Sequence, residues 1–173
     1  QIMGVDILSY IFSFVVYVLL QGLVLNHINF LGDVNPYLYV LFILHLPTGC
    51  NRTMVQILAF LLGLSIDFFS GTIGVNAGAT LLMGFLKPHM DKIFSPREDN
   101  KMIVPGFRSY GTNTFIQYAS ILVLAHHIAL FTLSAFTFDK LHLVLFKGVC
   151  STLFTLLLIF IIEYYRSKRR IDE

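Results

Sequence analysis

The chain has 173 residues, of which 56% are hydrophobic and 13% are charged, and its formal net charge is +2. Soluble domains average about 25% charged residues, so this composition excludes an ordinary soluble domain, a disordered chain and a nucleic-acid-binding protein. A membrane-spanning helix needs about 20 apolar residues, and the length therefore accommodates about six of them. We predict an all-α polytopic membrane protein that forms a single transmembrane domain over residues 1–173.

The predicted spans follow one another along the chain with short connections. They cover residues 7–30, 36–47, 53–70, 73–87, 113–137 and 141–165. The second, bracketed by Pro36 and Pro47, is at the lower limit of length, so it either crosses the bilayer or forms a re-entrant piece. A polar stretch over residues 87–112 is predicted to be a cytoplasmic loop. Its first part, residues 87–94, is predicted to lie on the membrane surface as a short amphipathic piece.

The basic residues predict the orientation of these spans. All Lys and Arg residues except Lys140 and Lys147 fall on one side, which is therefore predicted to be cytoplasmic. Six spans place the N-terminus in the cytoplasm as well, whereas five would place it outside, and no charge before Arg52 decides between them. The basic tail over residues 166–173 is predicted to be cytoplasmic and to hold the orientation through Arg166, Lys168, Arg169 and Arg170.

Small residues recur at every fourth position of the third span, which places them on one face of a helix. Such a face lets a second helix backbone approach closely within a membrane. The turn into the fourth span is only a few residues long, so these two helices are predicted to form a tight antiparallel hairpin. The face consists of Ala59, Gly63, Asp67 and Gly71, and Gly74 and Gly78 are predicted to form the matching face.

Among the acidic residues within the predicted spans, Asp67 has the position that most needs a physical explanation. A carboxylate in the middle of a membrane helix costs about 2.5–3.5 kcal/mol on insertion scales, and such residues usually face a cavity or a partner. Three roles stay open: a cap for the backbone N–H groups of residues 71–74, a proton or cation site, and an anchor for a partner.

Two adjacent histidines lie in the fifth span. His126 and His127 point about 100° apart on a helix, so they are not expected to bind a metal together. His126 is predicted to form a buried hydrogen bond, or to line a polar cavity with Asn76 and Asp67. No pattern pairs a nucleophile with a base. We predict that the chain is not an enzyme and uses no metal or cofactor.

One segment resembles a known family. The spacing Gly63-x-x-x-Asp67-x-x-Ser70-Gly71-x-x-Gly74-x-x-Ala77 is similar to the signature segment of the rod shape-determining protein MreD family. The run from Pro36 to Pro47 resembles the short second span of that family. The close match covers residues 36–88, and the polar stretch over residues 87–112 is longer and more charged than the family's loops. The resemblance implies a bundle of about six helices, similar in architecture to the substrate-binding components of energy-coupling-factor transporters.

The resemblance also implies a function. It indicates a non-enzymatic subunit of the cell-wall elongation complex in the bacterial cytoplasmic (inner) membrane. The expected partner is MreC, a single-span protein, through which MreB filaments are coupled to the peptidoglycan synthase RodA and its penicillin-binding protein partner. The signature residues would shape the partner-binding or structural surface. The alternative is a small-solute, vitamin-like binding component of an energy-coupling-factor transporter, with Asn76 and His126 in its cavity.

Overall fold

The structure, a computed structural model, describes residues 6–28, 35–96, 102–135 and 141–169, and these contain helices and connections but no strand. Helix α1 (Asp6–Leu19) continues as a π-helical turn, η1 (Leu20–Val24), and a 3-10 turn, η2 (Leu25–His27). The other elements are α2 (Val40–Leu44), α3 (Arg52–Ser70), α4 (Val75–Phe94), α5 (Phe107–Tyr110), α6 (Thr112–Ala135) and α7 (Leu141–Arg169).

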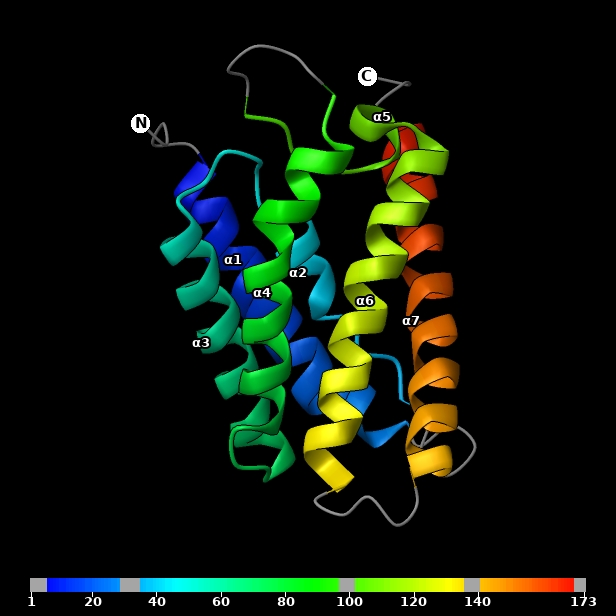
Figure 1. Cartoon of the computed structure of the whole chain (residues 1–173). Coiled ribbons are helices and arrows are strands. Elements are labelled where there is room, and N and C mark those ends of the chain that lie inside the picture. The colour runs from blue at the N-terminus through cyan, green and yellow to red at the C-terminus, as the bar shows by residue number, and fades with distance from the viewer. Residues whose placement is uncertain (1–5, 29–34, 97–101, 136–140, 170–173) are drawn as a thin grey trace.

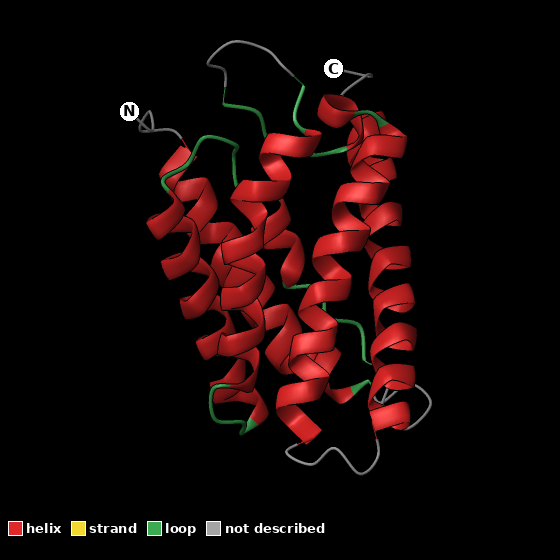
Figure 2. Ribbon diagram, in the orientation of Figure 1, coloured by secondary structure: helices red, strands yellow, loops and turns green. Residues whose placement is uncertain are grey.

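The long helices lie side by side in an antiparallel bundle (Figure 1, Figure 2). Helix α1 begins and α7 ends at the same end of this bundle, which we call the terminal end. The turn between α3 and α4 lies at the opposite end, which we call the hairpin end. Helices α1, α3 and α6 run towards the hairpin end, and α4 and α7 run back.

Within the described residues, four helices have the length and apolar composition needed to cross a membrane. They are Ile7–His27, Arg52–Ser70, Thr112–Ala135 and Phe146–Lys168. The predicted all-helical membrane protein is confirmed at this level, whereas the count of six spans stays a prediction. The predicted ends at residues 30 and 137 lie outside the described residues.

Helix α4 continues past the predicted span end at residue 87, through Pro88 to Phe94, so the first part of the predicted loop is helical. Residues 87–94 are therefore a continuation of this helix and not a separate piece on the membrane surface. The side chain of Lys87 is fully buried, and its Nζ lies 2.7 Å from Oδ2 of Asp91, one helical turn further on. This ion pair neutralises two charges, so a helix that carries them stays packed inside the bundle. The predicted loop also contains α5.

The proline-bracketed run is not a continuous helix, and its crossing of the bilayer, complete or re-entrant, stays a prediction. Only Val40–Leu44 are helical, and these five residues are buried at the centre of the bundle. Non-helical backbone at membrane depth is tolerated only where protein or water satisfies its polar groups. Here other helices do so: Gln21 bonds to the carbonyl of Pro36 and the amide of Leu38, and the Thr155 hydroxyl accepts from the amide of Tyr37. We call residues 35–51 the central segment.

Helices α3 and α4 pack with their backbones in close approach, as the small-residue face predicts. A Cβ atom on Gly63 would lie 2.6 Å from Cα of Ala77, and one on Gly84 would lie 2.7 Å from Cβ of Ala59. Ala59, Gly63 and Asp67 therefore lie on the contact face, as predicted. The matching face is different from the one predicted: a Cβ on Gly78 would approach Leu133 of α6.

Candidate functional site

Asp67, near the end of α3, caps the beginning of α4. Its carboxylate accepts hydrogen bonds from the backbone amides of Asn76 (3.0 Å) and Ala77 (2.9 Å), from the Asn76 side chain (3.0 Å) and from the Thr72 hydroxyl. All four partners are donors, which suits an ionised carboxylate. Of the three roles left open, this geometry is that of a cap, although the backbone donors belong to residues 76 and 77 and not to residues 71–74.

The rest of the signature segment forms the turn at the hairpin end. Gly71 (φ 66°) and Gly74 (φ 75°) adopt left-handed backbone conformations, which favour glycine. Gly71 ends α3, and Gly74 precedes the first residue of α4. Ser70 accepts a hydrogen bond from the side chain of Asn26 at 2.9 Å, which ties the turn to η2. The signature therefore specifies the close contact at Gly63 and Ala77, the cap at Asp67 and the turn.

Apolar side chains are exposed around this turn. Phe68 is 84% exposed and Ile73 is 97% exposed, and both adjoin the capped segment. The Asp67 side chain itself is buried, at 2% residue exposure, so it lies beneath this surface and not on it. A partner that binds here would contact Phe68 and Ile73, with Asp67 holding the backbone that presents them.

A chain of buried hydrogen bonds runs from Asp67 into the bundle. The side-chain amide of Asn76 donates to Asp67, so its oxygen is left to accept from the hydroxyl of Tyr39 at 3.0 Å. The Tyr39 oxygen lies 3.0 Å from Nε2 of His126 and accepts from it when that nitrogen carries the proton. The predicted buried hydrogen bond of His126 is thus present. It links α6 to α4 through the central segment.

His127 makes a separate set of contacts, as two adjacent helical positions require. Its Nδ1 lies 2.8 Å from the carbonyl of Val123, and its Nε2 lies 3.4 Å from the Thr155 hydroxyl. The same hydroxyl accepts from the amide of Tyr37. The two histidines therefore hold the central segment from different directions. Within the described residues, no cluster of three metal-ligating side chains is present.

A second polar cluster lies at the terminal end. Oε1 of Glu163 lies 2.8 Å from Nε2 of His45 and 3.1 Å from Nη1 of Arg166, and Oε2 accepts from the amide of Phe107 at 3.2 Å. Glu163 is 2% exposed, so this acidic group is buried and paired within the protein. It joins the central segment, α7 and the beginning of α5.

Asp91 organises the neighbouring part of the terminal end. Besides the ion pair with Lys87, it accepts a hydrogen bond from the hydroxyl of Tyr118 at 2.9 Å, and the hydroxyl of Tyr110 lies 3.4 Å from the same oxygen. Burial and the nearby carboxylate of Asp91 raise the pKa of Tyr110, so its hydroxyl keeps the proton that it donates.

The described part of the basic tail lies at the terminal end. Arg166 and Lys168 lie in the last turn of α7, and Arg169 is its final residue. Arg170 lies outside the described residues. Arg52 begins α3 at this same end, so the fold gathers cations from separate parts of the sequence there.

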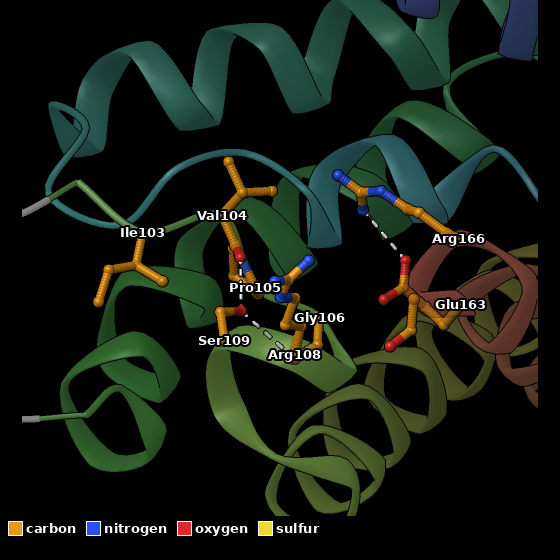
Figure 3. A pocket seen from close by; sticks show the side chains of 9 residues that line it. Ile103, Val104, Pro105, Gly106, Arg108, Ser109, Glu163 and Arg166 are labelled. Atoms are coloured by element: carbon orange, nitrogen blue, oxygen red, sulfur yellow. Dashed lines mark hydrogen bonds and ion pairs between the residues drawn. The ribbon is translucent and has the colours of Figure 1, made fainter. Parts of the chain in front are cut away.

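Two pockets open at the terminal end, and neither is lined by Asn76 or His126. One, of about 300 Å³, lies between residues 103–109 and the end of α7 (Figure 3). The other, of about 690 Å³, is an apolar groove between α1 and α3. The predicted cavity residues Asn76 and His126 are instead bonded to Tyr39 between them.

Sequence reasoning missed several residues of these networks. No sequence motif singles out Gln21, Tyr39 or Glu163. Each is a polar group within a long apolar run, which is the signal that marks a buried contact in a membrane bundle. The sequence does not reveal the partner, because the partner lies up to 118 residues away, as for His45 and Glu163.

Comparison with protein-family models, curated proteins and solved structures gives no match to this chain.

Proposed function

We propose that the protein is a non-enzymatic membrane scaffold of the MreD type that binds an MreC-like single-span partner. In that role it helps to couple MreB filaments to RodA and its penicillin-binding partner during cell-wall elongation. The observation that carries the proposal is the hairpin signature. Residues that resemble the MreD segment in sequence act together in the fold, as a close helix contact, a cap and a glycine turn.

The proposed partner surface is the exposed tip of this hairpin. Phe68 and Ile73 are apolar and exposed, and the capped turn below them fixes their backbone. Interfaces between membrane proteins rely on packing of side chains against preformed helices. A single-span partner that crosses beside α3 and α4 would pack its own helix or the adjoining segment against this tip.

The proposal includes the topology. Six passes, with the central segment as the irregular second one, put both termini in the cytoplasm of a bacterial inner membrane. The beginning of α1 and the end of α7 at the same end of the bundle support an even number of passes. The cations at the terminal end support its cytoplasmic position.

Co-purification with an MreC-like protein tests the partner surface. The double substitution Phe68→Ser and Ile73→Ser is expected to lower the yield of the partner severalfold, because it removes exposed apolar contact area. Phe146→Ser is the matched control, since this residue is also exposed and lies near the beginning of α7. Retention of the partner at full yield by the double variant would exclude this surface.

Asp67→Ala tests whether the cap beneath the exposed side chains contributes to partner binding. It is expected to weaken the partner complex and also to lower the melting temperature of the isolated protein, because buried donors lose their acceptor. The surface variant is expected to weaken the complex and leave the melting temperature within a few degrees of the wild type. If Asp67→Ala retains the partner at full yield, the cap does not contribute to the partner surface.

The small-solute alternative has less support. The side chains of Asn76 and His126 are engaged with Tyr39, and the two pockets described above are lined by other residues.

A further inference from the structure

The two pockets at the terminal end adjoin each other and differ in chemistry. Val104 lines both of them. The smaller pocket contains the guanidinium-bearing residues Arg108 and Arg166 together with Ser109 and Ser167 (Figure 3). The larger groove is lined mainly by apolar side chains of α1 and α3. A charged space and an apolar space therefore meet at one residue.

The smaller pocket carries a net positive charge. It contains two arginines and one carboxylate, Glu163, and this carboxylate is already engaged by His45, Arg166 and the amide of Phe107. Arg166 lines this pocket, and its side chain is 36% exposed although its Nη1 contacts Glu163. Arginine presents several N–H donors in a planar fork that suits a phosphate group.

The larger groove has the character of an apolar chain site. Its volume of about 690 Å³ falls within the range of about 300–1,000 Å³ that is typical of ligand pockets. It opens between exposed residues of α1, including Ile7 and Ile11, and of α3, including Met54. In a bilayer this opening would face lipid, because α1 and α3 are both candidate spans.

We propose that these two pockets form one binding site for an anionic phospholipid, with its phosphate beside Arg108 and Arg166 and one acyl chain in the groove between α1 and α3. Basic pockets beside membrane helices commonly bind anionic headgroups. The charge of the smaller pocket and the apolar lining of the larger one match the two halves of such a molecule. This site lies at the terminal end, away from the hairpin tip, and does not depend on the proposed partner.

Native mass spectrometry of the detergent-purified protein tests the site. The protein is titrated with phosphatidylglycerol, phosphatidylcholine and glycerol 3-phosphate. We expect one phosphatidylglycerol to bind more tightly than phosphatidylcholine. Arg108→Gln is expected to lower its affinity about fivefold, the effect of one cation near a membrane surface. Met54→Trp, which fills the groove, is expected to lower it further by excluding the chain.

Matched controls come from the same elements of the fold. Arg52→Gln removes a cation of the terminal end that lies outside both pockets, and Ile57→Trp places the same ring on an exposed position of α3 outside the groove. Both are expected to keep wild-type affinity. Circular dichroism verifies that every variant retains its helix content.

Three results would overturn the proposal. Equal affinity for the two phospholipids would exclude selection of a charged headgroup. If Arg52→Gln and Arg108→Gln lower the affinity for phosphatidylglycerol equally, the lipid is attracted by the general charge of this end and not by the pocket. Binding of glycerol 3-phosphate as tightly as phosphatidylglycerol, with no effect of Met54→Trp, would show a site for a free phosphate group and not for a lipid.

Discussion

Asp67 illustrates how one buried carboxylate is stabilised inside a membrane bundle. Its two oxygens accept from four donors, two of them backbone amides in the first turn of the next helix. Anionic groups are also favoured at a helix N-terminus by the helix dipole. The residue therefore offsets its own desolvation while satisfying amides that α4 would otherwise leave unpaired.

Gly63 is a second position at which a single added carbon atom is expected to change the packing of α3 against α4. A Cβ there would lie 2.5 Å from the backbone oxygen of Asn76 and 2.6 Å from Cα of Ala77, both in α4. We expect Gly63→Ala to destabilise the protein by about 1–3 kcal/mol, because the two helices must separate. The measurement is the free energy of unfolding in mixed detergent micelles. Gly148→Ala is the control, since its Cβ would make an ordinary 3.6 Å contact with Phe131. Equal stability of the two variants would show that α3 and α4 tolerate a wider spacing.

At the scale of elements, the central segment explains several polar residues of the surrounding helices. Gln21 lies in the π-helical turn that follows α1 and is fully buried. Its amide donates to the side chain of Asn26 and the carbonyl of Pro36, and its oxygen accepts from the amide of Leu38. A glutamine within a hydrophobic helix is thus the hydrogen-bonding partner of the non-helical stretch beside it.

For Gln21→Leu we expect a loss of stability, whereas the higher hydropathy of leucine alone would predict a gain. The substitution makes the α1 span more apolar, but it leaves the carbonyl of Pro36 and the amide of Leu38 buried without this partner. We expect a loss of about 1–3 kcal/mol, together with faster hydrogen exchange at the amide of Leu38. Gln117→Leu, on an exposed face of α6, is the control and is expected to have little effect. A more stable Gln21→Leu protein would show that water or a neighbouring group replaces the lost bonds.

Features that depend on residues close together in the sequence could be predicted, and features that depend on tertiary contacts could not. The hairpin was predicted because Ala59, Gly63 and Asp67 repeat at a helical period and a glycine turn follows. The matching face was misassigned, because period alone does not reveal that Gly78 is directed to α6. The extension of α4 beyond residue 87 was missed for a similar reason. Pro88 and a charged pair indicate an exposed loop locally, and only tertiary burial turns Lys87 and Asp91 into a stable contact.

At the scale of the whole molecule, the two ends of the bundle differ in the side chains that they present. The hairpin end presents a capped turn with exposed apolar side chains, and the terminal end gathers cations around two pockets. The described cations of the terminal end come from α3, α4, α5 and α7, which therefore contribute basic residues from several parts of the sequence to one end of the bundle. An uneven distribution of basic residues of this kind fixes the orientation of a membrane protein.

Cysteine labelling tests this orientation. In a background with Cys50→Ser and Cys150→Ser, we expect Ile73→Cys to react with a membrane-impermeant maleimide on intact spheroplasts, because residue 73 is exposed at the hairpin end. Lys168→Cys, at the terminal end, is expected to react only after the membrane is permeabilised. Labelling of Lys168→Cys on intact spheroplasts would reverse the proposed topology.

The central segment also constrains the order in which the protein is made. The amide of Tyr37 bonds to the hydroxyl of Thr155, and His45 bonds to Glu163, so both contacts join residues separated by 118 positions. Thr155 and Glu163 are therefore synthesised long after Tyr37 and His45. The segment can make these two hydrogen bonds only after α7 has been synthesised. The folded position of the central segment thus depends on contacts that α7 alone supplies through Thr155 and Glu163.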